Sequence, residues 1–459
     1  MIKTLGKISL PVTASFLFMV ACSTGGSEGA VRTEMMKWQD GKRAAISITY
    51  DDASINQFRI ALPLMEQKGF KGTFFINTGF IPGSRFHARY IGRPVEEIIA
   101  ETATIPTGPE NLFERASAVP YLGFPDLSQA QERAGEAVDD GNIERSCRII
   151  DEAYKKARAG KAAPARSIQG SAEANGSAEA SGSGYSGNNR ITWDELREFA
   201  GRGQEFANHT ISHPRLAVLD EVNMRWELEK CREEILNQLG PEHTFSCECP
   251  FGTENERVME VALQIHPALR NRMPHHWLEE LNRSSRRFPG ASDKTYVQWQ
   301  RGPVSSTSLE TMNGWIDTCL QHDDIWLVLV IHGVDGIGWE PLNSDTLDSF
   351  FNTISSHGQD LWVAPFRDVT KYMRERMSGT VKTTIKGRQI TVELGHELDR
   401  ELYNLPLTLK TTIPHRWEQI AISQAGEELD HQSGNDDSGK FVQYQARPNL
   451  GPVLISARR

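Results

Sequence analysis

A strand–helix–strand pattern near the N-terminus constrains the fold more than any other feature of the sequence. Residues 42–52, KRAAISITYDD, form an apolar, β-branched run that predicts a buried strand. Residues 54–70 follow with apolar side chains at helical spacing, and Gly69 is placed to end that helix. Residues 72–80, GTFFINTGF, predict a second buried strand. Two strands joined through a helix imply a parallel pair, so we expect an α/β fold.

The alternation of predicted strands and helices stops at about residue 83 and resumes after residue 189. Residues 94–103 and 143–160 have helical patterns, and residues 170–189 are rich in Gly, Ser and Ala. A tract of that composition cannot bury a core, so we expect it to be flexible or disordered. The sequence therefore predicts an insertion at about 83–189, partly helical and partly disordered, within a domain that spans residues 31–380.

The character of the sequence changes after Gly379. Short alternating runs such as VKTTIKGRQITVEL and KFVQYQARPNLGPVLISA are separated by turn residues. Alternation over a few residues is typical of half-buried strands. We therefore expect a small all-β domain at residues 381–459, built like a β-sandwich.

Composition excludes one class of partner. The chain has 459 residues and a formal net charge of −10, with 39% hydrophobic and 24% charged residues. These values are typical of a globular chain with more than one domain. Because there is no basic excess to neutralise phosphates, we do not expect a nucleic-acid partner.

The first 22 residues have the pattern of an export signal. A basic segment, MIKTLGK, precedes an apolar stretch that is short for a membrane span, and Cys22 follows a small residue. This resembles a bacterial lipoprotein signal, which implies lipidation of Cys22 and a lipid anchor in the cell envelope, at the outer membrane or the periplasmic face. The alternative is an ordinary cleaved signal with an incidental cysteine. The other five cysteines show no CxxC spacing, and we expect most of them to be small buried side chains.

Polar residues recur where the predicted strands end. Asp51 and Asp52 end the first strand, and His209 and His213 follow a later one, as the proline–phenylalanine–glycine turn at 250–252 and His332 follow others. In parallel α/β barrels the active site gathers at the carboxyl ends of the strands. Packing does not explain repeated polar residues at these positions, so they predict a functional site.

The segment NHTISHP, residues 208–214, places two imidazoles four residues apart. This spacing lets both side chains reach one metal ion. Pro214 disfavours a helix at His213, so a tight turn at a strand end is expected. The alternative is a pair of surface histidines near a helix start. The distant Asp51-Asp52 pair at another strand end favours the metal site.

The segments TYDD, HTISHP and LVIH, in this order, resemble the polysaccharide deacetylases of the NodB-homology type, carbohydrate esterase family 4. The resemblance covers roughly residues 38–379, interrupted by the insertion. It implies a distorted (β/α) barrel, followed here by the C-terminal all-β domain.

The resemblance also implies roles for five residues. Asp52, His209 and His213 would bind a divalent metal ion, commonly Zn²⁺. Asp51 would be the general base, and His332 the acid that protonates the leaving group. One carboxylate and two imidazoles leave open positions on a metal for water and substrate.

The sequence departs from the family pattern at three positions. Ala53 stands where the family has glycine, Glu248 where it has an arginine that orients the base, and Phe251 where it has tyrosine. Arg301, in WQRGP, is a candidate to replace that arginine, and Glu248 could instead face solvent without a role. The backbone N–H near Phe251 could still serve an oxyanion.

The substrate is expected to lie against Pro250, Phe251, Arg301 and Trp339. Trp339 belongs to a glycine-rich loop after His332, where an aromatic face could stack on a sugar ring. The predicted activity is metal-dependent hydrolysis of acetyl groups from a carbohydrate, N- or O-acetylated. The alternative is a non-catalytic cell-surface glycan-binding lipoprotein on a degenerate deacetylase scaffold.

Overall fold

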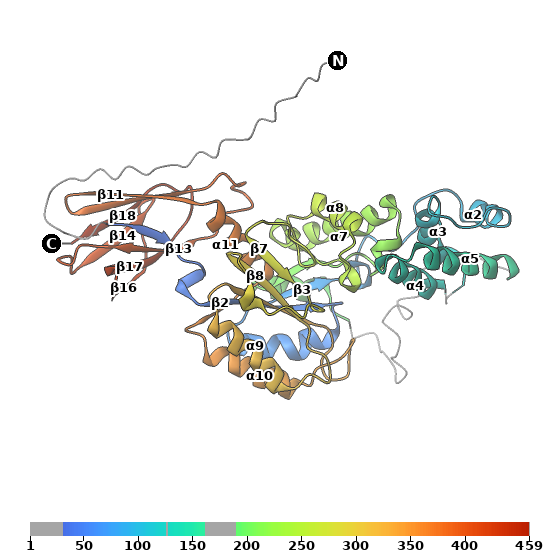
Figure 1. The fold of residues 1–459 in the computed structure, drawn as a ribbon, viewed down its shortest axis with the longest axis horizontal. Coiled ribbons are helices and arrows are strands. Elements are labelled where there is room, and N and C mark those ends of the chain that lie inside the picture. Colours follow the sequence, from blue (N-terminus) through green and yellow to red (C-terminus); the bar gives the residue numbers. More distant parts are fainter. Residues whose placement is uncertain (1–30, 125–126, 161–189, 459) are drawn as a thin grey trace, which may run out of the picture.

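The computed structural model describes residues 31–124, 127–160 and 190–458. Figure 1 shows three parts in a row: a β-rich unit that contains the C-terminus, a central α/β unit, and a group of helices at the far end. Residues 1–22, Cys22 included, and the Gly/Ser/Ala-rich tract lie outside the described residues. None of the described helices combines the length and the apolar character that a membrane span requires.

The central unit is a nine-stranded sheet in which every strand pair is parallel. The order is β6-β5-β4-β3-β2-β9-β8-β7, and β10 pairs with the first residues of β2. The strands are β2 (Ala44–Asp51), β3 (Thr73–Ile76), β4 (Glu205–Asn208), β5 (Ser246–Cys247), β6 (Ala268–Leu269), β7 (Leu278–Leu281), β8 (Tyr296–Arg301), β9 (Ile325–Ile331) and β10 (Leu361–Val363).

The sheet has apolar side chains on both faces, which explains why its central strands read as continuous apolar runs. Ile46 and Ile48 of β2 join the core under the surrounding helices, whereas Ala45 joins a second core inside the curl of the sheet. The surrounding helices are α1 (Leu62–Gln67), α6 (Trp193–Gly201), α7 (Glu221–Leu239), α8 (Glu256–Ile265), α9 (Leu309–Gln321) and α10 (Ser344–Ser356), whereas α11 (Phe366–Ser378) packs into the second core. The predicted α/β fold, a distorted open barrel, is confirmed.

The insertion forms a helical unit with its own core. Its helices are α2 (Val95–Glu101), α3 (Leu112–Ala118), α4 (Leu127–Asp139) and α5 (Ile143–Ala159). α2 and α5 form where the helical patterns predicted them, whereas α3 and α4 were not predicted. Ile150 and Tyr154 of α5 are fully buried, and Ala217 and Val218 of the central unit pack into the same core. These contacts attach the insertion to the loop that follows His213 (Figure 1).

The C-terminal unit consists of two antiparallel sheets around one core. One sheet has the order β1-β13-β17-β16 and the other β11-β12-β18-β14-β15. Their strands are β1 (Thr33–Met35), β11 (Thr380–Lys386), β12 (Gln389–Gly395), β13 (Leu407–Thr412), β14 (Ile420–Gln424), β15 (Glu427–Glu428), β16 (His431–Asp436), β17 (Gly439–Ala446) and β18 (Val453–Ala457). The additional all-β part is confirmed. Strand β1, which precedes the barrel in the sequence, pairs with β13 of this unit.

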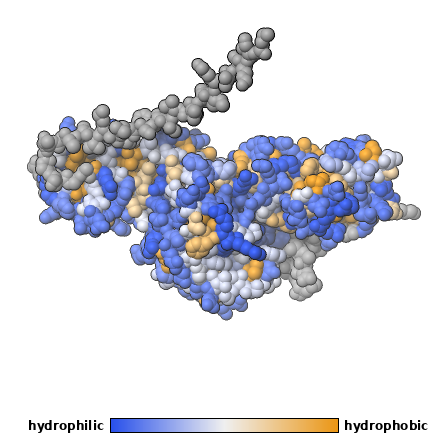
Figure 2. Space-filling model, viewed as in Figure 1, coloured by the Kyte–Doolittle hydropathy of each residue, from blue (hydrophilic) through white to orange (hydrophobic). Residues whose placement is uncertain are grey.

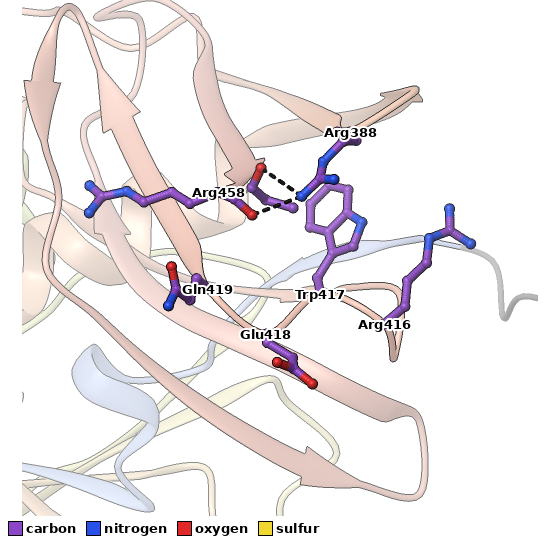
Figure 3. A pocket seen from close by; sticks show the side chains of 7 residues that line it. Arg388, Arg416, Trp417, Glu418, Gln419 and Arg458 are labelled. Carbon is purple, nitrogen blue, oxygen red and sulfur yellow. Dashed lines mark hydrogen bonds between the residues drawn. The ribbon is translucent and has the colours of Figure 1, made fainter.

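A small cavity of about 220 Å³ opens at one end of the C-terminal unit. Figure 3 shows Arg388 there, with its guanidinium donating to the main-chain oxygens of Ala457 and Arg458. Trp417 lines the same cavity but is only 2% exposed. The face of the molecule in Figure 2 is mostly hydrophilic, with hydrophobic residues in small groups, as is usual for a folded surface.

Candidate metal and proton-transfer site

The parallel sheet brings the polar strand ends to one edge. Strand β2 ends at Asp51, β4 ends just before His209, and β9 ends just before His332. Strands β9 and β3 both pair with β2, and β4 pairs with β3. Because all of these strands run in the same direction, their carboxyl ends lie on the same side of the sheet.

Asp52, His209 and His213 converge at this edge. One ligand atom from each lies within 4.8 Å of the other two. The Oδ1 atom of Asp52 is 3.5 Å from Nε2 of His209 and 3.2 Å from Nε2 of His213. This oxygen is buried and has no hydrogen-bond partner. A buried carboxylate oxygen aimed at two imidazole nitrogens fits a bound divalent cation.

His209 is oriented by its second ring nitrogen. Nδ1 lies 2.8 Å from the main-chain oxygen of Glu248, so Nδ1 carries the proton and donates it to that oxygen. The Nε2 lone pair is then left facing Asp52. A carbonyl partner of this kind fixes the tautomer and the ring orientation of a metal-binding histidine.

His213 reaches the same point because the chain makes a tight turn after β4. Thr210 and His213 have φ values of 71° and 59°, and the Thr210 hydroxyl accepts a hydrogen bond from the His213 N–H at 2.9 Å. The buried carboxylate of Glu227, on α7, accepts the N–H groups of Ile211 and Ser212, both at 2.9 Å. The expected tight turn is therefore present, and the Glu227 carboxylate stabilises it by accepting two of its N–H groups.

The charges of the three candidate ligands depend on each other. Burial alone would raise the pKa of Asp52, but His213 and His209 outweigh burial and lower that pKa. Burial lowers the pKa of His213 to about 4. Burial would lower the pKa of His209, but Asp52 and Asp51 outweigh burial and raise it. An ionised carboxylate and neutral imidazoles are the forms that bind a metal ion, so a bound cation would displace the proton that His209 favours without it.

Asp51 points into the curl of the sheet and pairs with Arg270, which directly follows β6. The Arg270 Nη1 and Nη2 atoms lie 2.8 and 2.6 Å from the two carboxylate oxygens. Burial would raise the pKa of Asp51, but the guanidinium and His332 outweigh burial and lower that pKa to about 2. Asp51 is therefore ionised at neutral pH although it is only 2% exposed.

Two expectations about the altered third motif are wrong, and the position of Arg270 explains the first. Glu248 does not face solvent: it is 3% exposed, and its carboxylate lies 2.9 Å from Nη2 of Arg270. Arg301 does not replace the motif arginine, because it lies on the side of β8 opposite Gln300, with its guanidinium 4.6 Å from the ring centre of Trp299. Gln300 points inward and donates to the main-chain oxygen of Arg270 at 2.7 Å.

His332 lies on the other side of Asp51. Its Nε2 atom is 3.5 Å from Oδ2 of Asp51, and its ring centre is 4.8 Å from that of Trp339. Burial lowers the pKa of His332, while Asp51 and Asp52 act in the opposite direction. Trp339 is 45% exposed, so the tryptophan forms the outer wall beside His332.

Phe251 forms the wall beside the candidate metal ligands. Its φ of 63° turns the chain in the loop after β5, and its ring centre lies 4.7 Å from that of His213. Pro250, next to it, is buried. Ala53 also has a positive φ, 54°, which is the conformation that favours the glycine of the family pattern.

Sequence reasoning missed Arg270 and Glu227. Arg270 follows a two-residue strand in HPALRNR, and Glu227 lies within a helix rich in charged residues. A buried charge in such a context is recognised only through its partners, and those partners are distant in the sequence. The pattern gave no local signal for either residue.

Three comparisons with known proteins bear on this site. Residues 169–266, which include both histidines and the altered third motif, match the family model described as polysaccharide deacetylase. A curated relative named gellan lyase, from a Bacillus species, is 23% identical over 277 residues. That match covers 57% of this chain but 11% of the relative, so the chain spans about a tenth of that protein.

Two solved structures show a distant likeness. A peptidoglycan N-acetylglucosamine deacetylase is 13% identical, with 72% of this chain and 95% of that chain covered and a TM-score of 0.32. A family 4 carbohydrate esterase from Bacillus subtilis is 10% identical, with 73% and 83% covered and a TM-score of 0.32. Scores this low support no inference about activity.

Proposed function

We propose that this chain, which belongs to the polysaccharide deacetylases of the NodB-homology type, is a metal-dependent hydrolase that removes acetyl groups from a carbohydrate. The observation that carries the proposal is the arrangement around Asp52. The candidate cation cluster of Asp52, His209 and His213 lies next to the ionised Asp51, and Nε2 of His332 lies 3.5 Å from Oδ2 of Asp51. Acetyl hydrolysis needs a Lewis acid, a base and an acid in this kind of proximity.

Asp52, His209 and His213 would hold the metal ion, and Zn²⁺ suits this set of one oxygen and two nitrogen ligands. When bound, the ion would polarise the acetyl carbonyl and make a water molecule more acidic. Asp52 and the two imidazoles use one atom each, so coordination positions remain for substrate and water.

Asp51 and His332 would move the protons. Arg270 keeps Asp51 ionised and fixes both of its oxygens, so Asp51 can accept the proton of the attacking water. Nε2 of His332 lies 3.5 Å from Oδ2 of Asp51, so His332 can give a proton to the leaving nitrogen or oxygen. The backbone N–H near Phe251 would face the developing oxyanion.

The alternative is a glycan-binding lipoprotein on a degenerate scaffold. Its main support was the loss of the motif arginine, but Arg270 provides a guanidinium on Asp51 from another strand. The bidentate pair supports an active enzyme, because a site without a reaction has no need for a buried, oriented aspartate.

Acetate release from a panel of N- and O-acetylated glycans tests the proposal. We expect release that a chelator abolishes and Zn²⁺ restores, and loss of release in Asp51→Asn. If the metal-loaded protein releases no acetate from any glycan of the panel but still binds glycan, the non-catalytic alternative is favoured.

We also propose that the protein is anchored in the cell envelope through lipidated Cys22. The support is the signal-like pattern of residues 1–22. Incorporation of a labelled fatty acid in cells, compared with Cys22→Ser, tests this. Equal labelling of the two proteins would refute the anchor.

A further inference from the structure

Arg283, in the loop between β7 and β8, reaches the edge of the candidate site. The aliphatic part of the Arg283 side chain packs over Gly302. A Cβ atom added at Gly302 would lie only 2.9 Å from Cδ of Arg283. The Arg283 guanidinium ends at Gly252, where an added Cβ would lie 2.7 Å from Nη2. Two glycines therefore leave the space that this side chain occupies.

The loop that carries Arg283 is tied to the opposite end of the open sheet. The Asn282 amide donates to the carboxylate of Glu254 at 2.6 Å, which joins the loop after β7 to the loop after β5. Arg301 lies within 3.5 Å of the main-chain oxygen of Arg283 and donates to it. These two hydrogen bonds fix the main chain of the loop on both sides of the Arg283 side chain.

Arg283 differs from Arg270 and Arg215, two other arginines near the site, in its lack of a carboxylate partner. Arg270 pairs with Asp51 and Glu248, and Arg215, whose guanidinium lies 4.3 Å from the ring centre of Phe251, pairs with Asp139 at 2.7 Å. Arg283 forms no ion pair with any residue in the described part of the chain. Its side chain is partly exposed, so its charge remains available to a ligand.

The guanidinium is placed where substrate would lie. Gly252 directly follows Phe251, whose ring contacts His213. After burial, Arg283 and Arg270 are the two cations that lower the pKa of His332, which places the charge of Arg283 within electrostatic reach of that side chain. Because Nη2 of Arg283 lies beside Gly252, a group bound by Arg283 would lie near Phe251 and His213, at the edge of the candidate metal site.

We propose that Arg283 forms an anion subsite beside the metal site, which selects an acetylated carbohydrate with a carboxylate or sulfate group on a sugar next to the acetylated one. This inference rests on the proposed deacetylase function. A guanidinium presents paired N–H donors that match a planar carboxylate or two sulfate oxygens. In a chain with a net charge of −10, an unpaired arginine at the site also offsets the repulsion that an acidic glycan would meet.

The test compares one acetylated oligosaccharide that contains uronic acid with its carboxyl-reduced counterpart and with a sulfated counterpart. We expect wild-type protein to prefer an anionic form in kcat/KM, and the preferred form identifies the anion. Because hydrogen bonds to charged groups contribute to binding more than neutral ones, Arg283→Gln should reduce the preference ratio about 10- to 100-fold. Arg283→Lys should retain part of the ratio, because it keeps the charge but loses the paired donors.

Arg287→Gln is the matched control, since it removes the same charge from the same loop. Arg287 pairs with Glu279 at 2.6 Å, and its side chain is 69% exposed. The control should keep the wild-type ratio. A ratio near one in the wild type, or an equal loss on all three substrates in Arg283→Gln, would refute the subsite while the deacetylase activity stands.

A binding measurement separates this inference from the proposed function. Calorimetry with the deacetylated uronic-acid oligosaccharide needs no turnover and no metal ion. Weaker binding to Arg283→Gln than to Arg287→Gln, with equal melting temperatures, supports the subsite even if no acetate is released from any substrate. The same titration is made with the deacetylated sulfated oligosaccharide, and equal binding of both ligands to the two variants refutes the subsite.

Discussion

Arg270 faces Asp51 with two parallel hydrogen bonds of 2.8 and 2.6 Å, although the residues are 219 positions apart. The same guanidinium also contacts Glu248, at the position where the family pattern has arginine. The chain thus keeps a guanidinium on the candidate base but supplies it from the end of β6 instead of β5. The position of the charge is retained although the residue that provides it has changed.

Replacement of Arg270 should affect both activity and folding. Arg270→Gln leaves two buried carboxylates without their cation, so we expect a loss of about 3–5 kcal/mol in the free energy of unfolding. Activity should fall as well, because Asp51 loses its orientation and its low pKa. Urea unfolding and acetate release measure the two effects.

A charge exchange serves as the control for that experiment. Glu248→Arg combined with Arg270→Glu returns the guanidinium to the β5 position and keeps the net charge. The double variant should be more stable and more active than Arg270→Gln alone. If it is no better, the contact with Asp51 depends on the β6 position itself.

The adjacent aspartates should separate metal binding from proton transfer. Asp51→Asn should retain bound Zn²⁺ but lose about 10²–10⁴-fold in turnover, the usual contribution of a general base. Asp52→Asn should lose the metal ion, because its Oδ1 atom is the one that faces both imidazoles. Metal content after dialysis, compared with acetate release, decides between these roles. Retained turnover in Asp51→Asn would assign the base elsewhere.

Glu227 should be needed for metal affinity although it is not a candidate ligand. Glu227→Ala removes the acceptor of the Ile211 and Ser212 N–H groups, so the turn that presents His213 loosens. We expect a decrease of about 10- to 100-fold in Zn²⁺ affinity, as is typical for outer-shell partners. Glu229→Ala, an exposed position on the same helix, is the control. Unchanged affinity in Glu227→Ala would show that the turn holds itself.

The junction between the barrel and the C-terminal unit should be sensitive to pH. The Glu375 carboxyl lies 3.3 Å from Nε2 of His396 and accepts the Leu405 N–H at 3.0 Å. Burial raises the pKa of Glu375 from 4.5 to about 7, while Leu405 and Lys371 act against it. The folded protein therefore keeps a proton that the unfolded chain releases, and this stability is present below pH 4.5 and lost as the pH rises towards about 7.

Glu375→Gln tests that assignment, because glutamine cannot ionise. Melting temperatures of the wild type should fall relative to the variant between about pH 5 and about pH 8, in the direction that linkage requires. Glu393→Gln, exposed on β12, should follow the wild type. A constant difference between wild type and Glu375→Gln across this range would mean that Glu375 is already ionised in the folded protein.

The sequence predicted those parts of the molecule that local patterns encode. The apolar run of β2 and the two acidic residues after it indicated both the strand and the side of the sheet that carries the site. Pro214 predicted the turn at His213 for a steric reason. Each of these inferences depended on residues that are neighbours in the chain.

The remaining features depend on distant partners. Strands β5 and β6 have two residues each, too short for any periodicity to be visible, and Arg270 follows one of them. Nothing local distinguishes Glu248 as buried, because its burial is a consequence of the guanidinium that comes from another strand. The pairing of β1 with β13 is equally hidden, since three residues with no strong pattern carry it.

That last pairing has a consequence for the order of folding. Thr33 of β1 meets Thr411 of β13, 378 residues later, so β1 cannot find its partner until β13 has left the ribosome. Contacts this distant in sequence form slowly, because a long loop must close first. During synthesis the barrel strands emerge while β1 still lacks its neighbour, and an unpaired strand is open to wrong partners. We therefore expect β1 to pair with β13 only after the barrel strands between them have folded.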